Sequence, residues 1–235
     1  MADVTDRYLE AVRSGSDAFW AAIEAADMQA RVPACPNWRA ADLAWHLAEV
    51  HHSWATIVAD RVLDPSGLSI PERPPDDQLV AFGRRQADFL LDALAGADPS
   101  THVWTWAPQQ DVAFVRRHQA VEAAVHRWDA ESVVDPRPGA IDKWLAADAI
   151  DEFLQFSAPH SHKDASPVGG TLHLHATDAD QGWLVEAEGR GPDAHLRGTA
   201  SDLLLVLHRR LPFDVVEVTG DRDVAERFVA RTNLD

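Results

Sequence analysis

The stretch Glu122-Ala-Ala-Val-His126-Arg-Trp-Asp129 lies within a run from Ala113 to Val134 that contains neither glycine nor proline. The absence of these helix breakers predicts one long helix. Residues four apart are neighbours on one helix face, so we expect Glu122 and His126 to lie side by side. A carboxylate and an imidazole in this arrangement can bind one metal ion, provided that another part of the fold supplies at least a third ligand.

The best candidate for the third ligand is His46. It lies between Leu43 and Val50 on the apolar face of a second predicted helix, where a histidine needs a polar partner. Two imidazoles and a carboxylate suit Zn²⁺, and the same set can hold Fe²⁺, Ni²⁺ or Mn²⁺. Three protein ligands leave one position open for water or substrate, as in catalytic rather than structural sites.

Two further residues flank the predicted pair on its own helix. Asp129 lies about one turn beyond His126 and is placed to support a histidine or to pair with an arginine. His118 lies one turn before Glu122. It can line the same cavity, although a surface position is the more common outcome for such a residue.

The remaining histidines and the single cysteine are less suited to this site. His51 and His52 fall on other faces of the second helix. His173 and His175 alternate on one face of a predicted strand, which can bind metal, although two exposed strand histidines are the commoner case. Cys35 precedes a helix N-terminus, which can favour a thiolate, but no partner is assigned to it and we interpret it as structural.

Helical periodicity dominates the first two thirds of the chain and predicts a helical bundle. Apolar spacing and breaker residues place five helices, at 4–26, 39–62, 76–95, 113–132 and 141–156. The segment 159–170 is polar and rich in breakers, which is typical of a linker between domains.

Alternating and short apolar segments follow this linker and indicate a smaller domain. Strands are expected at 171–176, 183–187, 194–198 and 215–218, and helices at 202–209 and 221–232. We therefore predict an α+β protein with two domains, a helical metal-binding domain over 1–158 and a small α+β domain over 168–235.

Composition restricts the partners of this protein. The formal net charge of −17 opposes binding to nucleic acids and to anionic membranes. No window resembles a membrane span or a signal peptide, and one cysteine allows no disulfide within the chain. We expect a cytoplasmic protein, monomeric or homodimeric, that acts on a small molecule.

Several motifs together resemble the mycothiol-dependent maleylpyruvate isomerase family, over nearly the whole chain. In the first predicted domain these are Cys35-Pro-Asn-Trp38, Asp42-Leu-Ala-Trp-His46-Leu47, Arg116-Arg117 and Glu122 to Glu131. In the second they are Leu172-His-Leu-His-Ala-Thr-Asp178, Gly198-Thr-Ala-Ser-Asp-Leu-Leu-Leu205, Arg210-Leu-Pro212 and Val218-Thr-Gly-Asp221.

The resemblance implies a DinB-like up-down four-helix bundle with a divalent metal at one end, followed by the family's smaller C-terminal domain. It implies metal ligation by His46, Glu122 and His126, usually of zinc. The thiol of mycothiol would bind the open position as a thiolate and add to an activated double bond or transfer onto another small electrophile. An arginine of the second domain would assist with the substrate, for which Arg209 and Arg210 are the first candidates and Arg197 another.

Two other functions remain open from the sequence. A metal-dependent hydrolase would use the same scaffold with water, rather than a thiol, in the open position. A non-enzymatic stress-response protein would use the metal only to brace the bundle, with a closed set of four protein ligands.

Overall fold

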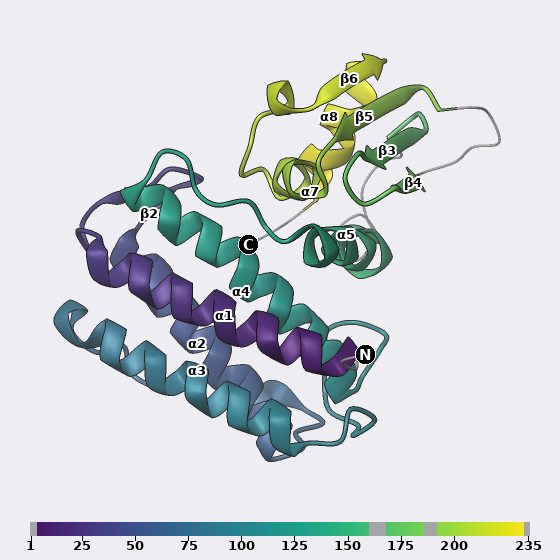
Figure 1. Ribbon diagram of the computed structural model, residues 1–235. Coiled ribbons are helices and arrows are strands. Elements are labelled where there is room, and N and C mark those ends of the chain that lie inside the picture. The colour runs from purple at the N-terminus through teal and green to yellow at the C-terminus, as the bar shows by residue number, and fades with distance from the viewer. Residues whose placement is uncertain (1–3, 160–167, 186–191, 233–235) are drawn as a thin grey trace. The chain divides into compact units, whose positions relative to one another are not determined.

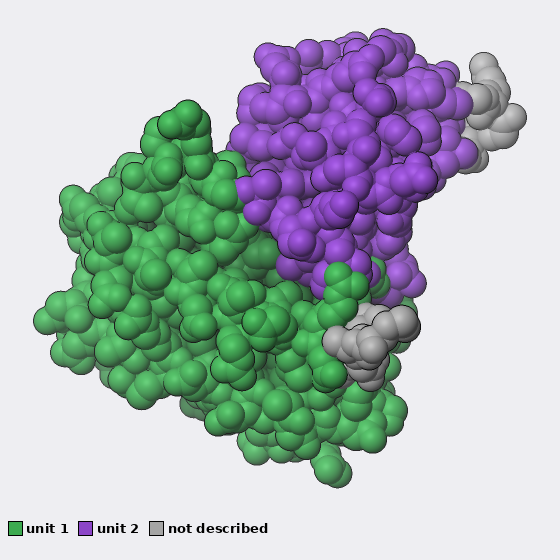
Figure 2. Space-filling model, viewed as in Figure 1, with its two compact units in different colours: residues 1–139 green, residues 140–235 purple. Residues whose placement is uncertain are grey.

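The computed structural model describes residues 4–159, 168–185 and 192–232 of the chain (Figure 1). It consists of two compact units, Met1–Gly139 and Ala140–Asp235 (Figure 2). The first unit is almost entirely helical, and the second combines helices with a four-stranded sheet. The predicted α+β fold with two domains is therefore confirmed.

Four long helices make up most of the first unit (Figure 1). They are α1 (Val4–Ala25), α2 (Ala40–Ala59), α3 (Leu79–Gly96) and α4 (Val112–Val134). A hairpin of β1 (Arg31–Val32) and β2 (Cys35–Arg39) joins α1 to α2. Two short 3₁₀ turns, Pro65–Gly67 and Asp76–Gln78, interrupt the connection from α2 to α3.

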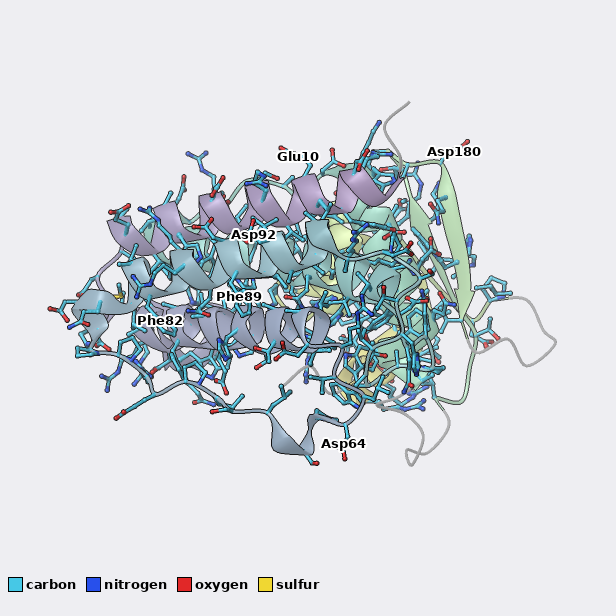
Figure 3. All side chains as sticks on the ribbon, turned by 90° about the horizontal axis from the view of Figure 1, so that it is seen from below. Glu10, Asp64, Phe82, Phe89, Asp92 and Asp180 are labelled. Atoms are coloured by element: carbon cyan, nitrogen blue, oxygen red, sulfur yellow. The ribbon has the colours of Figure 1, made fainter. Side chains whose placement is uncertain are left out.

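Helices α2 and α3 run in the same direction. The rings of Trp45 and Phe82 lie 6.0 Å apart, and about two turns further along each helix the rings of His52 and Phe89 lie 6.2 Å apart (both phenylalanines are labelled in Figure 3). Because α2 and α3 are parallel, the chain that leaves the end of α2 must run back along the helices before α3 begins. The 18-residue helix α3 is about 27 Å long, so this connection must be long. The breaker-rich segment 60–78 provides that path.

Helices α2 and α4 run in opposite directions. His46 packs against His126 with ring centroids 4.9 Å apart, and two turns later on α2, Trp54 packs against His118 two turns earlier on α4, at 5.9 Å. With the hairpin reversing the chain between α1 and α2, the helices run up, down, down, up. An up-down bundle alternates at every step, so the predicted alternation does not hold between α2 and α3.

A buried arginine caps the C-terminal end of α3. The guanidinium of Arg116, near the start of α4, donates hydrogen bonds to the carbonyl oxygens of Leu94 and Ala97. These carbonyls have no partner within their own helix, so the arginine satisfies them where water has little access. Arg116 is buried and structural, which leaves it unsuited to bind an anionic ligand from solution.

The second unit is built on a sheet in the strand order β4-β3-β5-β6, with β3 parallel to β5 and the outer pairs antiparallel. Its strands are β3 (Leu172–Ala176), β4 (Gln181–Val185), β5 (Ala194–Gly198) and β6 (Glu217–Gly220). Its helices are α5 (Lys143–Glu152), which continues as a π-helical turn over Phe153–Ser157, α7 (Ala200–Leu207) and α8 (Arg222–Arg231). Thr199 caps α7, because its side-chain hydroxyl accepts the backbone N–H of Asp202 at 3.1 Å.

Helix α5 belongs to the second unit. The carboxylate of Asp151 accepts hydrogen bonds from the indole N–H of Trp183 at 2.7 Å and from the amide of Gln181 at 2.9 Å, both on β4. The units therefore divide at 139/140, whereas the sequence suggested 1–158 and 168–235 with α5 in the bundle. Residues 160–167 of the expected linker and 186–187 of the expected strand lie outside the described residues.

Alternation along β3 separates two faces of the sheet. Leu172, Leu174 and Ala176 are buried, while His173 and His175 point to the other face and are partly exposed. Among the described residues, no helix combines the length and the apolar character that crossing a membrane requires.

Candidate metal centre

The structure brings together the three residues that the sequence proposes as metal ligands. His46 comes from α2, and Glu122 and His126 come from α4. One ligand atom from each residue lies within 4.8 Å of the others. The two helices run antiparallel and pack together at this point. His46 on α2 therefore faces Glu122 and His126, which are one turn apart on α4.

The separations suit a small divalent cation. Glu122 Oε2 lies 3.4 Å from His126 Nε2. Ligand atoms at 2.0–2.2 Å from a tetrahedral Zn²⁺ are themselves about 3.4 Å apart, so this pair already spans one edge of such a site. The rings of His46 and His126 are nearly perpendicular, at 76°.

Asp129 fixes the orientation of His126. Its carboxylate is fully buried, and Oδ2 accepts a hydrogen bond from Nδ1 of His126 at 3.0 Å. With the proton on Nδ1, the lone pair of Nε2 faces Glu122, as a metal-ligating histidine requires. Asp129 thus lies where the sequence predicts a supporting residue.

Charges at the centre favour a bound cation. Burial on its own would raise the pKa of Glu122, but the hydrogen bond and charge of His126, with smaller contributions from His118 and His46, lower it. Burial would lower the pKa of His126, yet the hydrogen bonds to Asp129 and Glu122 outweigh it and raise that pKa. The carboxylates of Glu122 and Asp129 therefore stabilise the positive charge of protonated His126. A divalent cation can take the place of this charge when His126 loses its proton.

His118 borders the centre rather than the surface. Its side chain is 15% exposed, and Nε2 lies 3.8 Å from Oε1 of Glu122. The ring stacks on Phe114 and meets Trp54 and Trp106 edge-on. The surface position that we regarded as more common is therefore wrong for this residue.

His51 is a neighbour of the centre that the sequence assigned to another face. It is fully buried, and neither ring nitrogen has a hydrogen-bond partner among the described residues. Burial is the main cause that lowers the pKa of His51 to about 3, so the ring is neutral. A second apolar stripe on α2, Leu47, His51, Ala55 and Val58, follows helical spacing and is the signal that identifies this residue as buried.

The candidate substrate arginines all belong to the second unit. Arg209 is exposed and has a positive φ of 57° at the end of α7. Arg210 is partly buried and donates a hydrogen bond to the carbonyl oxygen of His208 at 3.0 Å. Arg197 is 57% exposed and lies 3.6 Å from Glu217. Cys35, on β2 of the first unit, is partly buried against the apolar core, as expected for a structural cysteine.

Family models match both units of the chain. The model described as the mycothiol maleylpyruvate isomerase N-terminal domain matches residues 9–131, which is more than half of the chain. The model described as the MDMPI C-terminal domain matches residues 144–227, so it includes α5, as the second unit does. A search of curated proteins found no match.

Solved structures show the same fold. The crystal structure of a mycothiol-dependent maleylpyruvate isomerase is similar, with a TM-score of 0.73 and 15% identity over 93% of this chain and 95% of that chain. A histidine-to-alanine mutant of such an isomerase is similar over the same shares, with a TM-score of 0.67 and 14% identity. With both domain models matched in order, the chain belongs to the mycothiol maleylpyruvate isomerase family.

Proposed function

We propose that this protein is a divalent-metal-dependent enzyme that uses mycothiol and acts on a small electrophilic substrate, as a maleylpyruvate isomerase or a related thiol transferase. One observation carries the proposal. The ligand atoms of His46, Glu122 and His126 converge within 4.8 Å in a chain that belongs to this family.

The donor set fits zinc best. Two imidazole nitrogens and one carboxylate oxygen are the ligands of many catalytic zinc sites, and they leave a position open. When bound, such an ion would supply Lewis acidity that lowers the pKa of a thiol. Asp129 would keep Nε2 of His126 directed at the ion.

Aromatic side chains pack around His118, next to the carboxylate of Glu122. The ring of His118 lies beside Glu122, with Trp54 and Trp106 packed against it, and Trp54 stacks on Trp104 at 5.9 Å. This apolar surface excludes water from the His118 side of the centre and strengthens electrostatic interactions there, while the side chain of Glu122 remains 26% exposed. It also supplies contact area for the carbon skeleton of a ligand.

We assign the substrate carboxylate to Arg209 or Arg210. A guanidinium can donate two parallel hydrogen bonds to a carboxylate, which both binds and orients it. The support for this assignment is the family resemblance around Arg210-Leu-Pro212, together with the exposure of Arg209.

The test is metal analysis of the purified protein combined with an isomerisation assay. We expect about one equivalent of divalent metal and mycothiol-dependent conversion of maleylpyruvate to fumarylpyruvate. His46→Ala should lose both. His52→Ala is the matched control, because His52 lies on the same helix but contacts Gln86 at 3.0 Å and should retain both.

The proposal fails if the protein neither contains nor takes up a divalent metal, or if His46→Ala remains fully active. Turnover of an ester or amide panel without thiol would instead identify a metal-dependent hydrolase. Tightly held metal in a closed shell of four protein ligands, with no turnover of either kind, would indicate a structural metal.

A further inference from the structure

A second group of histidines lies in the other unit, on the face of the sheet opposite its buried residues. His173 on β3 is directly across from His195 on the parallel strand β5. Both side chains are partly exposed, while their strand neighbours Leu172, Leu174 and Leu196 are buried. These histidines take no part in the candidate metal centre, which lies in the first unit.

The register of the sheet pairs histidines across strands rather than along one strand. The rings of His173 and His175, two residues apart on β3, have centroids 6.3 Å apart. The rings of His173 and His195 are closer, at 5.4 Å, and nearly perpendicular, at 88°. The sequence singled out the pair on one strand, but only the pairing of β3 with β5 brings two ring nitrogens together.

The separation of these two nitrogens matches a chelating pair. Nδ1 of His173 and Nδ1 of His195 lie 3.3 Å apart. This is longer than the usual range of about 2.7–3.2 Å for hydrogen bonds donated by N–H groups. Two imidazole nitrogens at 2.0–2.1 Å from a tetrahedral Zn²⁺ are about 3.3–3.4 Å apart, so the observed distance equals one edge of such a site.

The neighbouring strand restricts the ring of His173. A Cβ atom at Gly182 on β4 would lie 3.0 Å from Nε2 of His173, so the ring fills the space that this glycine leaves open. Its Nε2 edge is thus directed at β4, and its Nδ1 edge at His195. Burial, followed by the nearby His195 and His175, lowers the pKa of His173, which favours the unprotonated ring that a metal ligand requires.

Charges around the pair are compatible with a bound cation. Arg197, the next residue of β5 on this face, lies 3.6 Å from Glu217 on β6, and this carboxylate offsets the arginine's charge. The formal net charge of −17 also favours the uptake of cations.

We propose that His173 and His195 form a second metal-binding site, for a divalent ion that prefers imidazole nitrogen: Zn²⁺, Ni²⁺ or Cu²⁺. The ion would bridge β3 and β5, two parallel strands with no direct turn between them, and water would complete its coordination. Such a bridge stabilises the second unit by reducing the freedom of the chain between the two strands.

The test is a Zn²⁺ titration of the full-length protein, followed by equilibrium dialysis and metal analysis. We expect two equivalents in the wild type, of which the second binds more weakly. His195→Gln and His173→Gln should each weaken the second equivalent at least about tenfold, and the first should be unchanged. His102→Gln is the matched control, because His102 is an exposed histidine of the first unit and its loss should change neither equivalent.

A second measurement needs no substitution. In the wild type, imidazole NMR signals of His173 and His195 should shift with the second equivalent of Zn²⁺, and amide exchange in β3 and β5 should slow. The proposal is overturned if only one equivalent binds, if the substitutions leave the second equivalent unchanged, or if the shifted signals belong to other histidines. The two histidines would then form only a hydrogen-bonded pair.

Discussion

At the scale of single residues, Asp129 determines how His126 presents its nitrogen. The carboxylate has no exposed surface and lies 3.0 Å from Nδ1 of His126, so it sets both the tautomer and the rotation of the ring. It lies one turn beyond His126 on α4 and is not one of the three proposed ligands. Replacing Asp129 should therefore weaken metal binding without changing which residues are the ligands.

We predict that Asp129→Asn lowers Zn²⁺ affinity at the first site about 10–100-fold, because an amide oxygen accepts the same hydrogen bond without the negative charge. Competition with a chromophoric chelator measures this change. Asp135→Asn is the control, since Asp135 is exposed and follows the end of α4. Unchanged affinity in Asp129→Asn would contradict a supporting role.

Gly83 shows how closely α1 and α3 pack. A Cβ atom at this position would overlap the six-membered ring of Trp20, which is buried in the core of the first unit. We predict that Gly83→Ala destabilises the protein by about 1–3 kcal/mol, since a buried ring must shift to make room for the added methyl group. Gly96→Ala, at the end of the same helix with nothing within 4 Å, should be neutral or slightly stabilising. Urea denaturation distinguishes the two, and equal effects would argue against the close packing.

At the scale of elements, the N-terminus of α2 is held by one carboxylate. Asp42 accepts the backbone N–H of Arg39 at 3.0 Å and a guanidinium N–H of Arg73 at 2.9 Å. These contacts tie the start of α2, the helix that carries His46, to the return segment before α3. The hydrogen bond from Arg39 is the main cause that lowers the pKa of Asp42 below its ordinary value of 3.8, and Arg73 adds to it.

This lowered pKa gives the pH dependence a definite sign. The ionised carboxylate stabilises the fold, so its contribution is present above the unfolded pKa of about 4 and is lost as the pH falls through the lower folded pKa. We predict that Asp42→Asn costs about 1 kcal/mol or less at pH 7, because the pair is partly exposed, and costs less still at pH 3. Urea denaturation at both pH values measures this. A cost that grows in acid would contradict the assignment.

At the scale of the whole molecule, the chain is two units with separate cores. Asp151 belongs to the second, where it joins α5 to Gln181 and Trp183 on β4. The proposed Zn²⁺ ligands belong to the first, and Arg209 and Arg210 to the second. Each unit is stabilised by its own contacts.

We predict that Asp151→Ala destabilises the second unit by about 1–3 kcal/mol, because the buried indole N–H of Trp183 loses its acceptor. Hydrogen exchange followed by mass spectrometry should show faster exchange in α5, β3 and β4. Exchange in α1–α4 and Zn²⁺ binding at His46, Glu122 and His126 should stay at wild-type values. Equal loss of protection in both units would contradict the division at 139/140.

Local features of this protein follow from its sequence alone. The breaker-free run predicts α4, and helical spacing places Glu122 beside His126 because residues four apart always share a face. Period-two alternation predicts β3 and separates its buried residues from its histidines in the same way. These are properties of a few consecutive residues, and backbone geometry determines them wherever the element lies.

Which elements meet, and in which direction, was decided only by the tertiary structure. The parallel course of α2 and α3 and the placement of α5 in the second unit both depend on packing between segments far apart in the chain. The same holds for His173 and His195, whose nitrogens meet because β3 pairs with β5 in one register. Local periodicity shows which face of an element is apolar, but the partner of that face depends on the packing free energy of the whole unit.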